Sequence, residues 1–264
     1  MRDLRAELGS DPGAWEDLEI ALGDAGKAAD LLVVYAALPE QKKIDERTVA
    51  LRDKAVLLAK AMRDSEGAFV AGPYRDHVED IMRAGRELTK LFSAREAEVV
   101  SAMTADLGLS GGARPLTVTL VEDAPYPGAF AADDEGHAAT AFLRVRGLSG
   151  ADLVEALLME VVHALDELTV RSPSAMNKLR AALAQNGIDE SDSNAEMIIQ
   201  AVMFAESASL VRRFVDPAHH ALAEKGFYVA YPPGAAVATA WEKYVAGETL
   251  EKTVEAIVHA VSAP

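Results

Sequence analysis

A glutamate and a histidine stand close together in the segment Leu157–Asp166, which is otherwise apolar up to Leu165. The composition of the segment predicts a helix, and residues four apart on a helix share a face. Met159 and His163 therefore point the same way, with Glu160 beside them. A carboxyl group held in an apolar cleft has a raised pKa, which suits proton transfer. Glu160 and His163 are thus candidate catalytic residues, and Met159 is a candidate for an apolar wall that contacts substrate.

The run Met159-Glu160-Val161-Val162-His163 resembles the HEXXH motif of the zinc metallopeptidases (zincin or gluzincin-like proteins). In that family two histidines bind zinc, and the glutamate acts as general base on the metal-bound water. The resemblance places Glu160 on the general base, His163 on the second ligand and Met159 in place of the first ligand. A thioether is a weak ligand for zinc. The motif is therefore degenerate, and we expect no ordinary zinc hydrolysis.

Zinc-peptidase scaffolds take a third ligand, often a glutamate, from a later helix. We expect this helix from about Asn194 to Val215. The resemblance places Ser209 on the acidic position, and Glu206, one turn earlier on roughly the same face, is a candidate shifted ligand. Gln200 belongs to the same helix. We take Gln200, Glu206 and Ser209 as candidate substrate-binding residues, and His163 with Glu206 as the metal ligands if a metal binds.

Two histidines and two tyrosines after this helix are further candidates. His219 and His220 are adjacent on a predicted loop, so at most one of them would face a cleft; the alternative is a solvated turn. Tyr228 or Tyr231 would close over the cleft and donate a hydrogen bond to a substrate carbonyl, as tyrosines do in several zinc peptidases. The alternative is that these rings pin the loop to the core.

The elements that position these residues are mostly helical. Ser93-Ala94-Arg95-Glu96 is a capping-box pattern that predicts a helix start, and Ser110–Pro115 is the clearest break in the chain. Alternating β-branched residues predict a short strand at 116–121 and another at 138–145. Helices are expected over 151–167, from Ser174 to Asn186, and over 194–215, 233–246 and 250–261. The predicted fold is α+β and predominantly helical, with a helical N-terminal region (1–110) and a zincin-like C-terminal domain (111–264), in which a small sheet accompanies two cleft-forming helices.

Composition narrows the classes of partner. The net charge of −16 and the lack of Lys/Arg clusters argue against nucleic acid and anionic membranes. The chain has no cysteine, which excludes disulfides, a thiolate zinc site and a Cys nucleophile. We see no signal segment and no apolar stretch long enough to span a bilayer. A cytoplasmic location is expected, and the oligomeric state is not predicted.

Three functions are compatible with these patterns. The first is a non-peptidase enzyme that performs metal-independent acid/base chemistry on a small molecule or peptide, with Glu160 as general acid or base and His163 as its partner. The second is an inactive pseudopeptidase that acts as a binding module. The third is a metallohydrolase with shifted ligands, namely His163, Glu206 and one of His219 or His220. No cofactor is expected in the first two functions, and zinc is expected in the third.

Overall fold

A computed structural model describes residues 60–61, 63–68, 70–109, 116–122, 129–132, 140–168, 174–188 and 193–262. Packing divides the chain into two compact units, Met1–Glu79 and Asp80–Pro264. Most of the predicted N-terminal helical region lies outside the described residues. The boundary predicted at residues 110/111 falls inside the second unit and stays a prediction. Within the described part, no helix combines the length and the apolar character that crossing a membrane requires.

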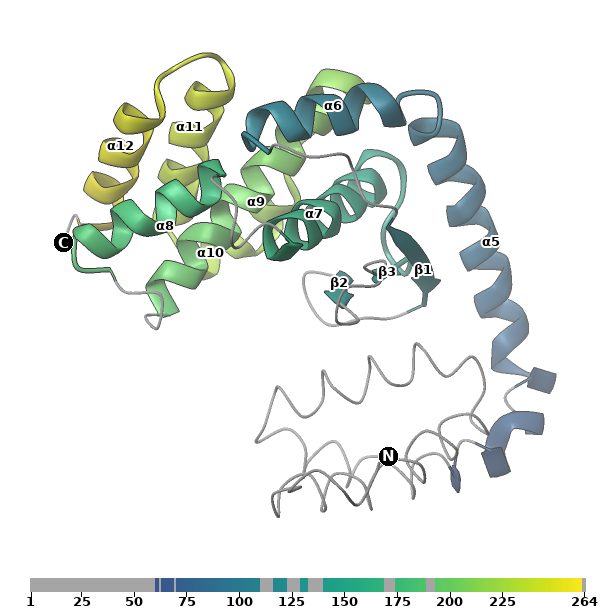
Figure 1. Cartoon of the computed structure of the whole chain (residues 1–264). Helices are drawn as coiled ribbons and strands as arrows, with labels where there is room; N and C mark the ends of the chain where they lie inside the picture. The colour runs from purple at the N-terminus through teal and green to yellow at the C-terminus, as the bar shows by residue number, and fades with distance from the viewer. Residues whose placement is uncertain are drawn as a thin grey trace. The chain divides into compact units, whose positions relative to one another are not determined.

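Helices predominate in the described residues, which confirms the α+β class with mostly helical content (Figure 1). Their bounds are α5 Pro73–Phe92, α6 Glu96–Asp106, α7 Gly150–Leu168, α8 Ala175–Gln185, α9 Ser193–Phe214, α10 Phe227–Ala230, α11 Pro233–Val245 and α12 Leu250–Ser262, with a 3₁₀ turn η1 at Leu222–Lys225. The predicted bounds of α7, α8, α9, α11 and α12 match these closely. Apolar periodicity and capping residues were therefore sufficient to place the helices.

A small sheet lies against α7. Its strands are β1 (Thr117–Val121), β2 (Ala129–Ala132) and β3 (Thr140–Arg144), in the order β1-β3-β2. The central strand β3 pairs parallel with β1 and antiparallel with β2, and both β2 and β3 contact α7. Residues 141–143 of β3 are buried. A strand that is covered on both faces reads as a continuous apolar run, as this one does.

The core of the second unit is built around α9. This helix contacts α6, α7, α8, α11 and η1, and nearly every side chain from Ala195 to Val211 is buried. A helix that is covered on all sides shows no single apolar stripe. Small residues such as Ala201 and Ala205 leave room for neighbouring helices to approach. The hydroxyl of Ser207 is also buried, and it donates to the Met203 carbonyl at 2.8 Å, so its polarity is satisfied within the helix.

Two long-range hydrogen bonds hold the ends of helices. The backbone N–H of Gly150, the first residue of α7, donates to Oε1 of Glu87 on α5 at 2.7 Å. Gly150 has φ +56°, a conformation that favours glycine. The N–H of Ala175, the first residue of α8, donates to the carbonyl of Leu107 at 2.8 Å. Helix starts leave unpaired N–H groups, and here parts of the chain far away in sequence satisfy them.

Local caps follow the sequence in one case and depart from it in another. Ser174 caps α8 as predicted, because its side chain accepts the Asn177 N–H at 3.0 Å. The capping box predicted at Ser93–Glu96 is wrong. Arg95 occupies the N-cap position of α6 and makes no side-chain cap. Glu96 is therefore the first residue of the helix rather than the third, so it cannot fold back onto the cap as the motif requires.

Candidate functional site

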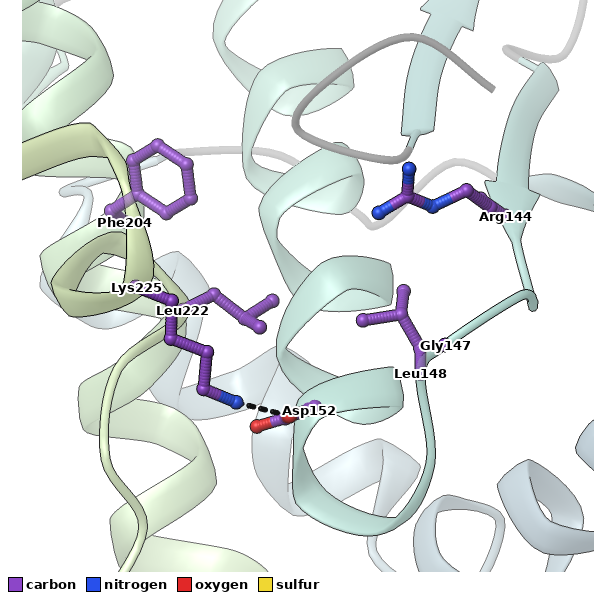
Figure 2. A pocket seen from close by; sticks show the side chains of 7 residues that line it. All are labelled: Arg144, Gly147, Leu148, Asp152, Phe204, Leu222 and Lys225. Atoms are coloured by element: carbon purple, nitrogen blue, oxygen red, sulfur yellow. Dashed lines mark hydrogen bonds and ion pairs between the residues drawn. The ribbon is translucent and has the colours of Figure 1, made fainter. Parts of the chain in front are cut away.

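A pocket of about 200 Å³ opens at the N-terminal end of α7 (Figure 2). We call it the α7 pocket, and it is lined by Arg144, Gly147, Leu148, Asp152, Phe204, Leu222 and Lys225. These residues come from the end of β3, the turn that follows it, the first turn of α7, the middle of α9 and η1. The two long helices that were predicted to form a cleft thus each contribute a residue to its lining.

Three charged side chains line the α7 pocket. Asp152 lies in the first turn of α7, where the helix dipole favours an acidic group. It forms an ion pair with the ammonium group of Lys225 at the end of η1. Arg144 stands on the opposite side, and Figure 2 shows its guanidinium group directed toward the pocket. Apolar side chains of Leu148, Leu222 and Phe204 complete the lining. The pocket therefore combines charged groups with an apolar surface.

A buried carboxylate holds one wall of the pocket in place. Glu155, one turn after Asp152, is completely buried. Its two oxygens accept the backbone N–H of Leu222 at 3.0 and 2.9 Å, and Oε2 also bonds Nε2 of His219. The other ring nitrogen of His219, Nδ1, lies 3.9 Å from Oδ1 of Asp152. We call Glu155, His219 and the Leu222 N–H the Glu155 cluster. It fixes the segment that carries Leu222 and Lys225 onto α7.

Contacts between aromatic rings support the part of the pocket wall that Phe204 forms. The ring of Phe204, which lines the pocket, lies 5.1 Å from that of Phe227 between centroids. Phe227 in turn lies 5.9 Å from Tyr231. The Tyr231 hydroxyl donates to Oδ1 of Asn194 at 2.7 Å, which ties this segment to the start of α9. Tyr231 thus anchors a loop to the core, and it does not line the pocket.

The residues predicted on α7 lie further along the helix. Met159 is 5% exposed and belongs to the hydrophobic core, and Glu160 is 3% exposed. His163 is partly buried. None of the three lines the α7 pocket. Since Met159 follows Asp152 by seven residues, the predicted site lies about 10 Å along the helix axis from the pocket. The structure therefore separates the motif from the pocket, although both belong to α7.

The residues predicted on α9 are dispersed in the same way. Gln200 is half-buried and Ser209 is buried, and neither lines the pocket. Glu206 is completely buried, and its Oε2 accepts the indole N–H of Trp241 on α11 at 2.9 Å. Across the described residues, no three His, Asp or Glu side chains come together as a metal-binding group. The shifted ligand set of His163, Glu206 and a later histidine is therefore not assembled.

Glu206 is held in an environment that favours its neutral form. The pKa of Glu206 is raised to about 8, mainly by burial and also by the carboxylate of Asp106 on α6, against the lowering effects of the Trp241 N–H and of Arg213. Arg213 itself bonds Oδ2 of Asp106 at 2.5 Å. The other oxygen, Oε1 of Glu206, is buried without a hydrogen-bond partner in the described structure. A protonated carboxyl group costs less here than an ion would.

The remaining predicted residues lie outside the pocket lining. His220 is exposed and lies 3.4 Å from Oε2 of Glu224, so it belongs to a solvated turn, whereas His219 faces inward. Tyr228 packs against Gly234, where an added Cβ would lie 2.9 Å from the Tyr228 ring. Burial, together with the nearby carboxylate of Glu155, raises the pKa of Tyr228, and the phenol stays neutral.

The sequence analysis missed the polar residues on α7 that precede the Met159–His163 motif. Asp152, Glu155 and Met159 are spaced three and four apart, so they follow one face of α7. Glu155 stands in an apolar run much as Glu160 does, and this was a usable signal. Its partner His219 was recognised as a candidate, but the pairing of the two was not. Arg144 and Lys225 gave no signal in the sequence.

The Glu155 cluster generates the first prediction. We expect Glu155→Gln to lower the free energy of unfolding by about 2 to 4 kcal/mol, because the amide nitrogen would face N–H donors and leave buried groups unpaired. The measurement is urea unfolding of the full chain. Glu255→Gln, at an exposed position of α12, serves as the matched control and should change little. Equal stabilities of the two variants would contradict the role given to the cluster.

The second prediction concerns pH. Because the pKa of Glu206 is about 8 in the folded chain against an ordinary 4.5, the folded state binds more protons than the unfolded state between these values. Stability from this group is therefore lost as pH rises, by up to about 4 kcal/mol between about pH 5 and about pH 8. Urea unfolding across this range should show the loss for the native chain and a flatter profile for Glu206→Gln. Parallel profiles would refute the assignment.

Comparison with known proteins finds no matching family model, and no curated protein or solved structure is significantly similar to the chain. The resemblance to the HEXXH peptidases is thus carried by the residues of the motif alone, and it stays a prediction.

Proposed function

We propose that this chain is a binding protein whose ligand is a small molecule held in the α7 pocket. The observation that carries the proposal is the construction of the pocket wall. The completely buried carboxylate of Glu155 accepts the backbone N–H of Leu222 and so fixes the Leu222–Lys225 segment against α7. Burying an ion is costly unless several hydrogen bonds compensate it. The cluster supplies such bonds, and the segment that it fixes carries two of the side chains that line the pocket.

The side chains that line the pocket are more typical of a binding site than of a catalytic site. Small-molecule sites combine an apolar surface with a few fixed polar groups. Leu148, Leu222 and Phe204 provide the apolar surface, and Arg144 with the Asp152–Lys225 pair provides the polar groups. This corresponds to the binding-module alternative from the sequence, with the ligand at the N-terminal end of α7 instead of at the motif. The cytoplasmic location belongs to the same proposal.

Acid/base chemistry by Glu160 and His163 is the second candidate function. It is favoured by one observation, the burial of Glu160 to 3% exposure in the middle of a helix, since buried ionisable groups often mark functional sites. His163 follows within one turn. Against it stands the position of both residues outside the pocket. A metallohydrolase with shifted ligands has less support, since the described side chains do not form a group of three ligands.

Blocking the pocket tests the proposed binding function. We expect Leu148→Trp to weaken the binding of small acids, amides and amines by at least about tenfold, because the indole would fill the space that they occupy. The control is Val229→Trp, at a position that is 78% exposed and outside the lining. Ligand-observed NMR with the full chain measures both. Compounds that bind the two variants equally well, or a native chain that binds none, would overturn the proposal.

Restoring the motif tests the peptidase kinship. Met159 packs in the core, so we expect Met159→His to lower the free energy of unfolding by about 2 kcal/mol or more, since a polar imidazole would replace an apolar thioether chain. Added zinc should not recover the lost stability. Thermal unfolding with and without zinc measures this, and Met82→His, at an exposed position of α5, controls for adventitious zinc binding. A zinc-dependent gain specific to Met159→His would instead support an inherited metal site.

A further inference from the structure

Two opposite charges stand side by side in the lining of the α7 pocket. The ammonium group of Lys225, at the end of η1, pairs with Oδ2 of Asp152, in the first turn of α7. Both positions are fixed, because the helix holds Asp152 and the Glu155 cluster holds the segment that ends at Lys225. Arg144 also lines the pocket, but it already interacts with another group, so we give it no part in recognising the charges of a ligand.

Each member of this ion pair retains hydrogen-bonding capacity for a ligand. An ammonium group has three N–H donors and a carboxylate has two acceptor oxygens, and the pair joins Nζ of Lys225 to Oδ2 of Asp152 alone. The other oxygen of Asp152, Oδ1, lies 3.9 Å from Nδ1 of His219, which is longer than a hydrogen bond. The side chains of Lys225 and Asp152 are 54% and 27% exposed, so a ligand can reach both from solvent. Since such an exposed pair contributes little to stability, its geometry can adjust to a ligand.

Two adjacent charges of opposite sign select for a ligand that carries both signs. A simple carboxylate attracted to Lys225 would meet the like charge of Asp152, and a simple amine attracted to Asp152 would meet the like charge of Lys225. A zwitterion avoids both repulsions when its carboxylate lies against the Lys225 ammonium group and its own ammonium group lies against Oδ1 of Asp152. In an α-amino acid a single carbon atom separates the two charged groups, so they fit beside two side chains that are themselves in contact.

The apolar lining sets the rest of the ligand. Figure 2 shows the side chains of Leu148 and Leu222 directed toward one another next to the ion pair, with Phe204 farther from it. Leu148 and Leu222 are half-buried and Phe204 is completely buried, so the lining becomes less exposed away from the charges. The pocket volume of about 200 Å³ equals that of about six or seven water molecules in the liquid. This space fits a short branched chain, and it is too small for a peptide of several residues.

We infer that the ligand of the α7 pocket is a free α-amino acid with a short, branched apolar side chain. Its carboxylate binds Lys225, its ammonium group binds Asp152, and its side chain lies between Leu148 and Leu222. The inference rests on the proposed binding function and adds the ligand class to it. Glu155 lies behind the lining with both of its oxygens engaged, so it is a positioning residue for the wall and makes no contact with the ligand.

The test compares three probes that share one carbon skeleton. Leucine carries both charges, isocaproate lacks the ammonium group, and leucinamide has a neutral amide in place of the carboxylate. We expect the native full-length chain to bind leucine at least about tenfold more tightly than either of the other two probes, as measured by NMR titration at constant ionic strength and mildly acidic pH. Lys225→Gln should remove the preference for leucine over leucinamide, and Asp152→Asn should remove the preference for leucine over isocaproate, because each variant removes the group that recognises one charge.

Two matched controls change the same kinds of charged group outside the pocket. Lys243→Gln alters an exposed lysine in the last turn of α11, and Glu251→Gln alters an exposed acidic residue in the first turn of α12. Neither residue lines the α7 pocket. Both variants should therefore retain the native preference for leucine over the other two probes.

The outcomes separate this inference from the proposed binding function. If isocaproate or leucinamide binds the native chain as tightly as leucine does, the amino-acid inference is overturned while the binding function stands. If none of the three probes binds, but other compounds bind the native chain and are lost in Leu148→Trp, the inference again fails alone. If nothing binds the native chain, both proposals fall together.

Discussion

The arrangement of the residues around the α7 pocket depends on the buried carboxylate of Glu155. It joins α7 to residues that follow 64 and 67 positions later in the chain. A carboxylate removed from water needs its acceptor sites filled, and here a backbone N–H and an imidazole fill them. Because these donors belong to one short segment, satisfying the carboxylate also sets the position of η1. The geometry of the α7 pocket follows from that placement.

The first turns and the middle of α7 have different roles. Its first turns carry Asp152, which pairs with Lys225, and the buried Glu155, which bonds His219 and the Leu222 N–H. Its middle carries Met159, which packs with the apolar residues around α9. Space for a ligand exists where a helix leaves the close-packed interior, since such interiors have few voids. The motif that resembles a zinc site thus occupies the packed part of the helix, and the pocket occupies its end.

The sequence was sufficient to predict the helices and strands, but it was not sufficient to predict the candidate site, and the reason is physical. Helix periodicity, the Ser174 cap and the apolar β3 strand are local signals, readable within a few residues. The capping box at Ser93 failed because α6 begins at Glu96, after Arg95, which makes no side-chain cap. Glu160 ranked above Glu155 because it had His163 nearby in sequence, but the partner of a buried carboxylate is decided by what packs across from it. His219 supplies that partner from another segment, and no spacing rule within one helix contains this information.

The α7 pocket also depends on α5, which contributes no residue to its lining, because the Gly150 N–H donates a hydrogen bond to Glu87 of α5. The first turn of α7, which presents Asp152, is held by a side chain of α5, and the buried Met103 of α6 and the Leu107 that follows it belong to the same core. If the chain were recombined at residue 110, the transferred part would carry the pocket but would lack Glu87, which caps the start of α7. In evolutionary terms, we expect α5 and the α7 pocket to be inherited together, because Glu87 of α5 caps the start of α7.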